Sequence, residues 1–504
     1  MQRSYRSPDA SPSLLERYGR AGLVGLLGTV LISLAASLPG APFALKVPGA
    51  WFFGVPAPTQ GGIAHASGFL LLCDLIIGFT GILLLCRSWL SIYRGVTRDR
   101  EKRTGRLALI LAIWSVPLLI APPMFSNDIY DYAAQGELVS HHINPYVYGP
   151  GVLGASPFST LAHGFWINTP SPYGPLFNGL DGGIVQLTGH RVLISIVVLR
   201  LLAVLGVALI AIFLPLLARS YGQDPSVAFS LGVLNPLVLL FLIASGHNDA
   251  LMVGLLVTGL YTARRGHCAW GIVLCALAGA IKAPGLIGVF AIGWTWGGAD
   301  SSWRRCFNLA KAAVIAAVTF EALSTFFGLG WGWVRTLGAS NTVTTWITPT
   351  DLIGKAIPAL SGVAHVTGLI AAVAISLWQL KRLPVIGLPR AMGLILLAIV
   401  LLGPIVQPWY LMWGIPILAI TAGARTSSAI IYLSVSVSLL GVVGLGDLTN
   451  AIGSLGPLYQ LLFALTMAAL LLVPIRRTSG DNRSTILNSK DRRGPSPAGR
   501  MLRA

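Results

Sequence analysis

Long apolar segments separated by short polar ones recur along almost the whole chain. A membrane-crossing helix needs about 17–25 consecutive apolar residues. The segments that meet or approach this length are 21–38, 67–90, 107–122, 192–218, 226–245, 249–263, 268–282, 284–297, 309–327, 358–380, 391–406, 410–424, 428–446 and 459–475. Several are short, so the pattern predicts about 12–14 transmembrane helices. Interruptions around 282–284 and 407–410 predict broken helices that meet at the membrane face.

The composition supports this interpretation of the pattern. Hydrophobic residues make up 54% of the 504 residues, charged residues only 10%, and the mean hydropathy is +0.74. Such a chain cannot fold as one soluble domain, because it has too few polar residues to cover its surface. We therefore predict an all-α polytopic membrane protein.

The net charge of +18 is explained by membrane topology, and we predict no nucleic-acid partner. If the N-terminus is cytoplasmic, most lysines and arginines fall on the cytoplasmic side, as in the basic segment 93–106. We predict a basic cytoplasmic segment at 1–20, a transmembrane domain at 21–475 and a disordered basic cytoplasmic tail at 476–504. The longest polar loop, about 123–191, then faces outside.

Acidic and aromatic residues are concentrated at the start of that outer loop, in "MFSNDIYDYAAQGELVSHHINPYVYGP", residues 124–150. Residues 129–140 are good helix formers and predict a short helix lying along the membrane interface. On it Asp128, Asp131 and Gln135 form one polar stripe. Tyr130, Ala134 and Leu138 form the neighbouring apolar one.

Two roles are open for the carboxylates of this helix. Asp128 and Asp131 could cap the helix N-terminus, or Asp128 could be a general base whose pKa is raised by burial near hydrocarbon. A divalent cation held by the pair is a further possibility. His141 and His142 follow at the helix end. A metal site there needs another ligand, and none is evident at a suitable spacing, so capping or substrate hydrogen bonding is favoured.

Three other polar groups interrupt apolar segments. In "SGHNDALMVG", Asp249 could cap the next helix, or His247, Asn248 and Asp249 together could hydrogen-bond a sugar. Lys282 stands alone among apolar residues and needs an anionic partner. That partner could be a phosphate or one of the acidic residues Asp128, Asp249 and Glu321.

Aromatic residues and a second buried cation leave further alternatives. In "GPIVQPWYLMWG", Gln407, Trp409 and Tyr410 could bind a sugar, or the two rings could belong to an interfacial belt. Arg200 within an apolar helix is predicted to snorkel or to be paired.

Taken together and in order, "NDIYDYAAQGELV…NPY", "SPYGPLF", "NPL…GHNDALMVG", "KAP" and "QPWYLMWG" resemble one family. These motifs look like those of the polyprenol-phosphomannose-dependent alpha-1,6-mannosyltransferases of the actinobacterial cell envelope. The resemblance covers roughly residues 20–475 and implies a fold of the GT-C class, in which a polytopic glycosyltransferase opens its active site at the outer face of the plasma membrane.

The resemblance also implies an activity. Mannose would pass, with inversion, from polyprenyl-phosphate mannose to the 6-hydroxyl of a mannan or glycolipid acceptor, extending the lipomannan or lipoarabinomannan backbone. It implies no established cofactor and leaves a divalent cation open. The catalytic base would be Asp128, supported by Tyr130, Asp131 and Gln135. Donor or acceptor binding would fall to Tyr173, His247, Asn248, Asp249, Gln407, Trp409 and Tyr410, with Lys282 at the donor phosphate and Arg335 or Lys355 as alternatives.

Two rival functions remain at this stage. A transporter or flippase of a lipid-linked sugar would also place charged residues in the membrane. It would be expected to show internal repeats and polar groups near the midplane, whereas these motifs cluster at the outer edge and no repeat is evident. An enzyme of the same class could instead use another polyprenyl-phosphate sugar, such as arabinose.

Overall fold

The computed structural model describes residues 14–38, 42–44, 51, 68–98, 104–162, 164–298, 301–338, 348–403, 405–441, 452–453 and 455–472. Within these ranges every regular element is a helix, which confirms the all-α fold. The predicted tail at 476–504 lies outside the described residues, as do residues 1–13 of the predicted N-terminal segment.

The helices are those of a multi-pass membrane protein. Within the described ranges, five are long and apolar enough to cross a membrane, and a sixth span results if the bent pair Val238–Ala244 and Asp249–Arg264 is one crossing. Five further apolar helices in this part of the chain have 10–17 residues. Several predicted spans are broken into short pieces, so the total of about 12–14 crossings stays a prediction.

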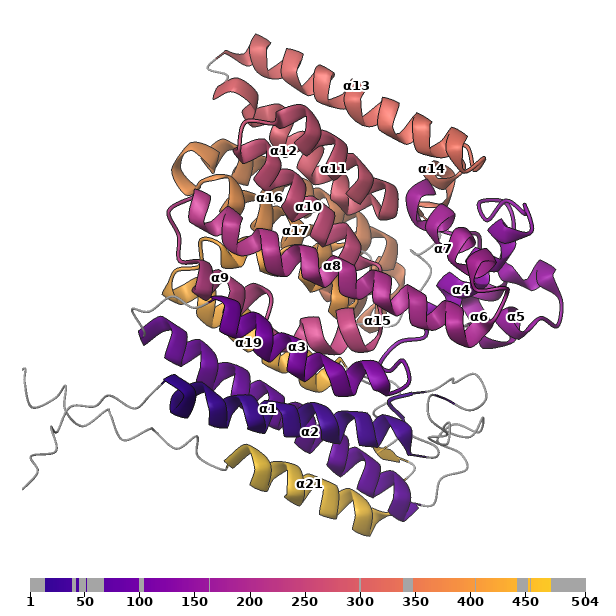
Figure 1. The fold of residues 1–504 in the computed structure, drawn as a ribbon, viewed down its shortest axis with the longest axis vertical. Coiled ribbons are helices and arrows are strands. Elements are labelled where there is room, and N and C mark those ends of the chain that lie inside the picture. Colours follow the sequence, from indigo (N-terminus) through magenta and orange to yellow (C-terminus); the bar gives the residue numbers. More distant parts are fainter. Residues whose placement is uncertain are drawn as a thin grey trace, which may run out of the picture.

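One group of helices forms a layer along one side of the molecule (Figure 1). Helix α1 packs along α2, α3 packs against α1, and the C-terminal helix α21 packs against α2. Their bounds are α1 Leu14–Ser37, α2 Gly68–Arg98, α3 Thr104–Ile120 and α21 Pro457–Leu472.

The central group contains the helices that carry most of the predicted motifs. Its elements are α8 Val192–Ser220, α9 Pro225–Gly232, the π-helix η4 Val238–Ala244, α10 Asp249–Arg264, α11 Cys268–Ile281, η5 Ala283–Leu286, α12 Ile287–Thr295, η6 Trp296–Gly298 and α13 Ser302–Phe326. Helix α10 lies between α8 and α11 and packs on both. A Cβ on Gly254 of α10 would lie 2.6 Å from the Gly206 carbonyl oxygen of α8. Small residues thus let these backbones approach closely, as is common between membrane helices.

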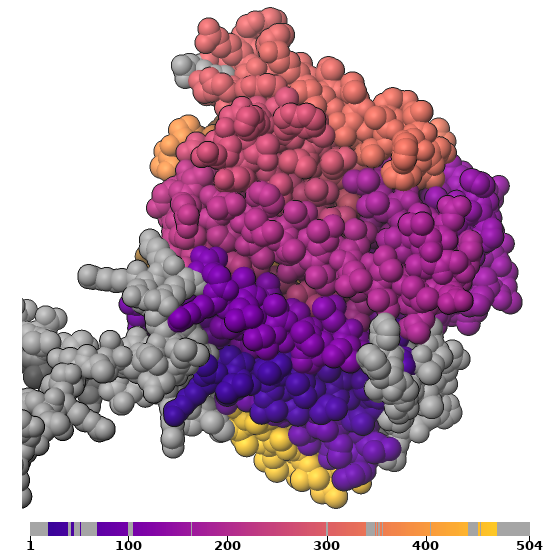
Figure 2. All heavy atoms as spheres, viewed as in Figure 1, coloured from indigo at the N-terminus to yellow at the C-terminus, as the bar shows by residue number. Residues whose placement is uncertain are grey.

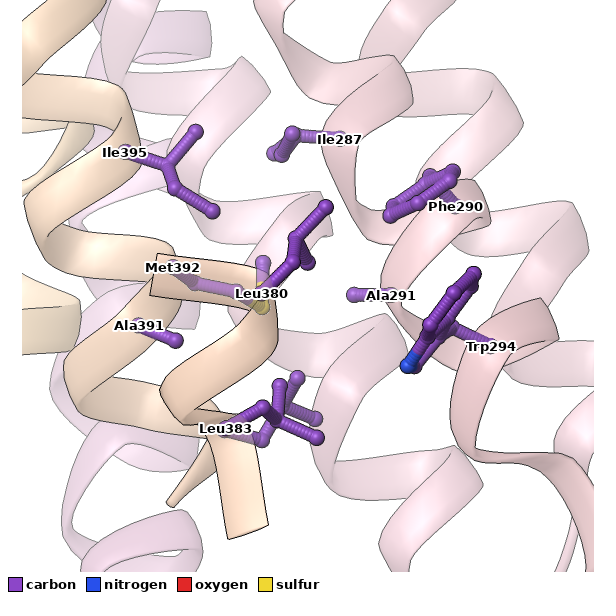
Figure 3. Close-up of a pocket in the computed structure, with 10 residues that line it drawn as sticks. Ile287, Phe290, Ala291, Trp294, Leu380, Leu383, Ala391, Met392 and Ile395 are labelled. Carbon is purple, nitrogen blue, oxygen red and sulfur yellow. The ribbon is translucent and has the colours of Figure 1, made fainter. Parts of the chain in front are cut away.

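The C-terminal group completes the bundle. Its elements are α14 Trp333–Thr336, α15 Pro349–Ala356, η8 Pro358–Leu360, α16 Ser361–Ile386, α17 Leu388–Leu402, η9 Pro408–Trp413, α18 Ile415–Ala419 and α19 Ala424–Leu440. A small hollow between α12, α16 and α17 is lined by apolar side chains such as Phe290, Leu380 and Ile395 (Figure 3). No carboxylate, histidine or lysine lines this hollow, so it does not qualify as a sugar site.

The predicted outer loop is a structured lobe at one end of the bundle (Figure 2). It consists of α4 Asp128–Ser140, η3 Pro150–Leu153, α5 Pro157–Leu161, α6 Gly164–Ile167 and α7 Pro175–Leu187. Helix α4 packs against α7 and reaches the start of α8. The helix predicted at 129–140 is therefore confirmed, although its buried residues 129–138 show that it is enclosed rather than lying free on a surface.

Helices break at the places that the sequence predicted. Helix α11 ends at Ile281, Lys282 is extended, and η5 follows. Helix α17 ends at Leu402, and η9 begins at Pro408. Between η4 and α10 the chain turns by 110°. These breaks place the polar motif residues at or next to helix ends buried within the protein, where irregular backbone in a membrane protein is tolerated.

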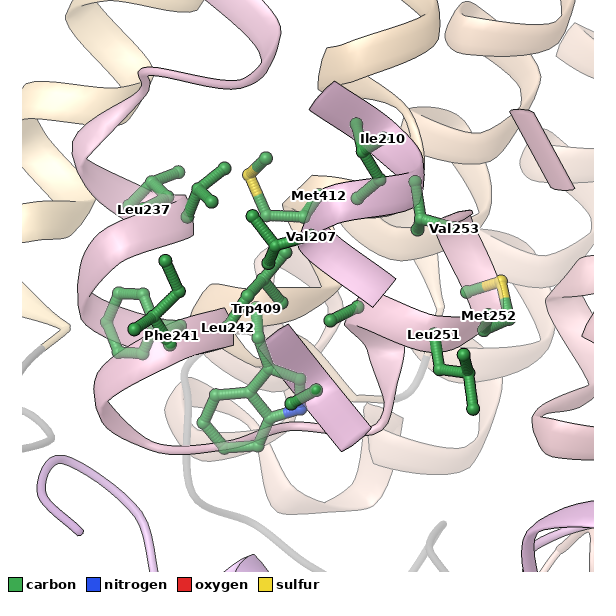
Figure 4. Packing of buried hydrophobic residues seen from close by; sticks show 14 of the residues in the cluster. Val207, Ile210, Leu237, Phe241, Leu242, Leu251, Met252, Val253, Trp409 and Met412 are labelled. Carbon is green, nitrogen blue, oxygen red and sulfur yellow. The ribbon is translucent and has the colours of Figure 1, made fainter. Parts of the chain in front are cut away.

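An apolar core lies directly behind those breaks. Figure 4 shows Trp409 among Phe241, Leu242 and Met412, with residues of α8 and α10 close by. The rings of Phe241 and Trp409 are 6.2 Å apart at 43°. All four of these side chains are at most 7% exposed. The packing fixes the broken segments in place and so orients the polar groups at their ends.

Candidate active site

The segment that leads into α4 is held by hydrogen bonds to the η4–α10 turn. The Met124 backbone amide donates to the Ala244 carbonyl at 3.4 Å, and the Ser245 hydroxyl donates to the Met124 carbonyl at 2.8 Å. Since Asp128 follows four residues after Met124, these bonds set its position relative to His247.

Arg200 of α8 strengthens the same junction. Its guanidinium donates to the carbonyls of Leu118, Leu119, Ala121 and Ala244 at 2.6–3.2 Å. The side chain is only 2% exposed. Carbonyl groups at a helix end lack partners within the helix, and Arg200 supplies donors for the end of α3 and the end of η4. Of the two expectations for this residue, pairing is the one observed, with backbone oxygens as the partners.

Gly246 makes the turn between η4 and α10. Its φ is +77°, in the left-handed region that favours glycine. A Cβ there would also lie 2.7 Å from a methyl carbon of Ile129 and 3.0 Å from Arg200 Cγ. The glycine of "GHND" thus lets the turn fit between α4 and α8.

Asp128 and His247 face each other across this junction. The Asp128 Oδ2 atom lies 3.4 Å from His247 Nδ1, and the Tyr132 hydroxyl lies 3.4 Å from the same nitrogen. His247 is fully buried, whereas the Asp128 side chain is 22% exposed. A carboxylate with one side open and the other held by an imidazole can accept a proton from a hydroxyl that approaches from the open side.

The charge state of Asp128 differs from the prediction. Burial opposes the charged form and is the largest single influence on this carboxyl. The hydrogen bond and electrostatic interaction with His247, the positive charge of Lys282 and a hydrogen bond from Ser126 together outweigh it, so the pKa of Asp128 lies below its ordinary value. The expected rise by desolvation is therefore wrong, because the partners of Asp128 in the site stabilise its charged form. Asp128 is ionised at neutral pH.

Capping explains neither Asp128 nor Asp249. The residue at the N-cap of α4 is Asn127, and that of α10 is Asn248, neither with a side-chain cap hydrogen bond. Asp128 and Asp249 are the first residues inside their helices, where a negative charge still interacts favourably with the helix dipole. Their carboxylates are directed to other partners.

Asp249 is the anionic partner of Lys282. The lysine Nζ atom lies 3.0 and 2.9 Å from the two carboxylate oxygens of Asp249. The indole nitrogen of Trp413 donates to the same carboxylate. Asp249 is fully buried, and the Lys282 side chain is 12% exposed. Of the three acidic candidates named for Lys282, Asp249 is the one that contacts it.

Aromatic rings surround the Lys282 ammonium group. It lies 4.5 Å from the ring centre of Tyr410, 5.7 Å from that of Trp413 and 5.8 Å from that of Tyr173. Burial raises the pKa of Tyr173 in the lobe, and nearby carboxylates add to the effect. Its phenol therefore remains protonated and able to donate a hydrogen bond. We call Lys282, Tyr173, Tyr410 and Trp413 the cation box.

Trp409 connects the cation box to the Asp128 side of the site. Its ring stacks on His247 with centres 3.7 Å apart at 19°, and it contacts Tyr410 edge-on at 5.9 Å. Neighbouring Gln407 precedes η9 and is 9% exposed, and its predicted binding role stays a prediction. Trp409 and Tyr410 are thus site residues rather than members of an interfacial belt alone.

Tyr173 reaches the site through the "SPYGP" segment. The Gly174 amide donates to the Ile281 carbonyl at 3.2 Å, which ties this segment to the residue before Lys282. The Tyr173 ring contacts Tyr132 edge-on at 5.2 Å. Residues separated by more than 100 positions in the sequence thereby meet in one cluster.

The three predicted supporting residues of α4 are buried. Gln135 and Asp131 are 1% and 2% exposed, and the Ser171 hydroxyl lies 2.9 Å from Gln135 Oε1 and 3.0 Å from Asn178 Oδ1 of α7. Tyr130 is buried, and its charged neighbour is Arg200. Gln135 is thus connected through Ser171 to α7, and the supporting roles of Tyr130, Asp131 and Gln135 stay predictions.

Asn248 is also placed beside the cluster, between His247 and Asp249. It is 2% exposed, and neither its amide nitrogen nor its amide oxygen has a hydrogen-bond partner among the described residues. Such groups are costly to bury unpaired. This makes Asn248 available to a bound hydroxyl. Of the alternative phosphate partners, Arg335 is exposed on α14, and the side chain of Lys355 lies outside the described residues.

Sequence reasoning missed Tyr132 and Trp413. Tyr132 lies one α-helical turn after Asp128, and Trp413 lies one turn after Tyr410 in the 3₁₀ helix η9, so both share a face with a predicted residue. Helical spacing from the predicted residues is the signal that would have found them. The divalent cation held by Asp128 and Asp131 stays a prediction, and the cluster of three potential metal ligands found in the described ranges lies elsewhere, at Glu137, His141 and His190.

The fold and the site define a multi-pass membrane protein with a carboxylate, a histidine and an aromatic-lined cation at one end of its helix bundle. Residues 22–298 match the family described as alpha-(1->6)-mannopyranosyltransferase, N-terminal domain, and residues 336–477 match the MptB C-terminal domain. The chain therefore belongs to the alpha-(1->6)-mannopyranosyltransferase family.

Individual relatives agree with this assignment. The chain is 32% identical to a probable alpha-(1->6)-mannopyranosyltransferase of Mycolicibacterium smegmatis over 85% of its length and 84% of the relative's. It is 30% identical to an alpha-(1->6)-mannopyranosyltransferase of Mycobacterium tuberculosis, covering 86% and 84%. It is 27% identical to alpha-(1->6)-mannopyranosyltransferase B of Corynebacterium glutamicum, covering 82% and 75%. No solved structure matches the chain.

Proposed function

We propose that this protein transfers mannose from polyprenyl-phosphate mannose to the 6-hydroxyl of an alpha-mannoside chain, with inversion at the anomeric carbon. One observation carries the proposal: the Asp128–His247 pair and the cation box lie together where broken helices end. The names of the relatives supply the sugar and the linkage.

A lipid-linked donor suits this location. Its isoprenoid chain stays in hydrocarbon, so its phosphate and sugar emerge where the helices end. Lys282 is 12% exposed and carries a positive charge toward that point. Its bidentate partner Asp249 holds the ammonium in place, and the three rings of the cation box limit access of water. A preorganised cation of this kind stabilises a phosphate leaving group.

The reaction then follows from the two halves of the site. The acceptor 6-oxygen attacks the anomeric carbon of mannose while Asp128 takes its proton. The bond between that carbon and the phosphate oxygen breaks, and its electron pair leaves with the polyprenyl phosphate beside Lys282. His247 holds Asp128 in place and favours its ionised form. Asn248 offers both a donor and an acceptor to sugar hydroxyls.

The distribution of charge supports an active site on the outer side of the membrane. Helix α8 starts beside α4 and runs to the opposite end of the bundle (Figure 1). At that far end lie Arg219 and Arg264, and the Arg264 guanidinium donates to the Ser220 carbonyl. By the positive-inside rule this end is cytoplasmic. We therefore place mannan extension, as in a lipomannan backbone, on the outer face.

The test uses the purified full-length protein in detergent. It is given radiolabelled polyprenyl-phosphate mannose or GDP-mannose and a short alpha-1,6-mannoside acceptor, with and without EDTA. Label should enter the acceptor from the lipid donor only, in a linkage that an alpha-1,6-specific mannosidase removes. Transfer from GDP-mannose would overturn the donor assignment. Two companion assays address the rivals. If protein reconstituted in liposomes moved the labelled lipid across the membrane without any transfer, the flippase would be favoured, and if transfer occurred only when polyprenyl-phosphate arabinose was supplied as donor, the sugar would be replaced.

A further inference from the structure

Two histidines and a glutamate lie close together in the lobe, away from the candidate active site. His141 Nε2 lies 3.1 Å from Glu137 Oε1, and His190 Nδ1 lies 2.8 Å from Glu137 Oε2. One ligand atom from each of the three residues lies within 4.8 Å of the others. The two imidazole rings are 5.3 Å apart at 32°. We call Glu137, His141 and His190 the lobe triad.

The backbone brings the triad together from two distant segments. Glu137 and His141 are four residues apart at the end of α4, so they share one helix face. His190 lies between α7 and α8, in a turn where Gly189 and His190 both have positive φ, 64° and 57°. The His190 amide donates to the Val185 carbonyl at 3.0 Å, which fixes this turn. The packing of α4 on α7 then sets His190 opposite Glu137.

The environment of the triad suits a bound ion. The Glu137 side chain is 9% exposed, and each of its carboxylate oxygens faces one imidazole nitrogen. The side chains of His141 and His190 are 53% and 41% exposed, so the outer side of the triad is open to solvent. A metal ion can enter from there and keep a water molecule as its fourth ligand. The Ser140 hydroxyl, 3.5 Å from Glu137 Oε2, is a neighbouring polar group.

The ligand types select the ion. Imidazole suits zinc, copper, iron and nickel, whereas magnesium and calcium prefer oxygen ligands. Zinc binds nitrogen at about 2.0–2.1 Å and oxygen at about 2.0–2.2 Å, so the ligand atoms of a zinc site lie close to one another. The three ligand atoms of the lobe triad, all within 4.8 Å of one another, are already near such an arrangement. The two exposed imidazoles have room to close on an ion, whereas Glu137 is already enclosed.

We propose that Glu137, His141 Nε2 and His190 Nδ1 bind one divalent transition-metal ion, with Zn²⁺ as the best fit. The ion fastens the end of α4 to the turn that begins α8. The same helix carries Asp128 at its other end, so the ion would brace the lobe without contacting substrate. The proposal does not depend on the proposed function, because its readout is metal binding.

The test is zinc stoichiometry in the full-length protein purified without a polyhistidine tag. The protein is stripped with EDTA, equilibrated with Zn²⁺ in excess Mg²⁺, separated from free metal and measured by elemental analysis. Wild type should retain one equivalent. His190→Gln and His141→Gln should each lose it, whereas His142→Gln, a change at the adjacent exposed histidine outside the triad, should retain it.

Thermal denaturation gives a second readout that does not need activity. Zn²⁺ should raise the melting temperature of wild type and of His142→Gln and leave His190→Gln unchanged, because only a ligand of the folded state stabilises it. Equal zinc retention in wild type and both triad variants, or no retention in wild type, would overturn the proposal. In the second case the histidines serve Glu137 as hydrogen-bond partners only.

Discussion

Lys282 binds both carboxylate oxygens of Asp249, at 3.0 and 2.9 Å, across the gap between a helix break and the start of α10. The pair joins two motifs, "KAP" and "GHND", that are 33 residues apart. A cation already neutralised by a carboxylate is inexpensive to keep near hydrocarbon. It remains available to a phosphate because its side chain is not fully enclosed.

Mutations of the Lys282–Asp249 pair should affect protein stability and donor binding differently. Lys282→Met leaves Asp249 buried without its cation, so the free energy of unfolding should fall by roughly 3–5 kcal/mol. Adding Asp249→Asn should recover most of that loss, because no unpaired charge remains. Neither protein should bind the lipid donor well. Thermal denaturation and donor saturation curves measure the two effects.

Lys311→Met is the matched control, since Lys311 is exposed on α13. It should change neither the melting temperature nor the KM for donor. If the Lys282→Met/Asp249→Asn protein bound donor as tightly as wild type, Lys282 would be a structural partner of Asp249 and not the phosphate ligand.

The Asn248 side chain should contribute more to substrate binding than to the stability of the fold. Its amide is buried and lacks hydrogen-bond partners in the described part of the chain. Asn248→Leu replaces this unsatisfied polar side chain with an apolar side chain of similar size. We expect an unchanged or higher melting temperature together with a kcat/KM lower by about 10-fold or more, equal to at least about 1.4 kcal/mol. A fall in stability without a fall in kcat/KM would contradict a binding role.

The pH profile should report the contact between Asp128 and His247. Because the folded-state pKa of Asp128 is lowered, the stability gained from its ionised form is present above the unfolded value of about 3.9. That stability is lost as the pH falls through the folded value. Wild-type kcat/KM should therefore show no loss attributable to Asp128 near neutral pH.

His247→Phe removes the hydrogen bond to Asp128 but keeps a ring to stack on Trp409. Burial then dominates, so the pKa of Asp128 should rise and the acid limb of the kcat/KM profile should move to higher pH. An acid limb at the same pH in both proteins would mean that His247 does not control the charge of Asp128.

Arg200 should be necessary for the shape of the site. Arg200→Met leaves the carbonyls of Leu118, Leu119, Ala121 and Ala244 without their donors. We expect the free energy of unfolding to fall by about 3 kcal/mol or more, with loss of transfer because the segment before Asp128 is released. Arg219→Met, an exposed change on the same helix, should melt like wild type. Equal melting of both variants would contradict this account.

The sequence predicted the helical class, the helix breaks and most of the residues that the structure gathers at the candidate site, for identifiable physical reasons. Membrane helices are recognisable from apolar length alone, and a lone lysine or a charged tetrapeptide among apolar residues needs a polar partner. The sequence alone could not identify which residue that partner is. Lys282 had three acidic candidates, and only the packing of α10 on α11 selects Asp249.

The same limitation applies to the partners of the predicted supporting residues. Gln135 lies on the same helix face as Asp128, but its contact with Ser171, which also bonds Asn178 of α7, is a tertiary contact that helical spacing does not reveal. His190 lies far along the chain from His141, so its approach to Glu137 depends on how α7 folds back. The pKa of Asp128 was misjudged because burial was considered without the partners that the fold brings to it.

The most direct test of the central claim compares wild type with Asp128→Asn in transfer of radiolabelled mannose from polyprenyl-phosphate mannose to an alpha-1,6-mannoside. Asp131→Asn, a carboxylate loss one turn away on the same helix, is the control. We predict that Asp128→Asn binds donor normally but transfers about 10²–10⁴-fold more slowly, and that Asp131→Asn loses much less. Transfer by Asp128→Asn at the wild-type rate would show that Asp128 is not the base.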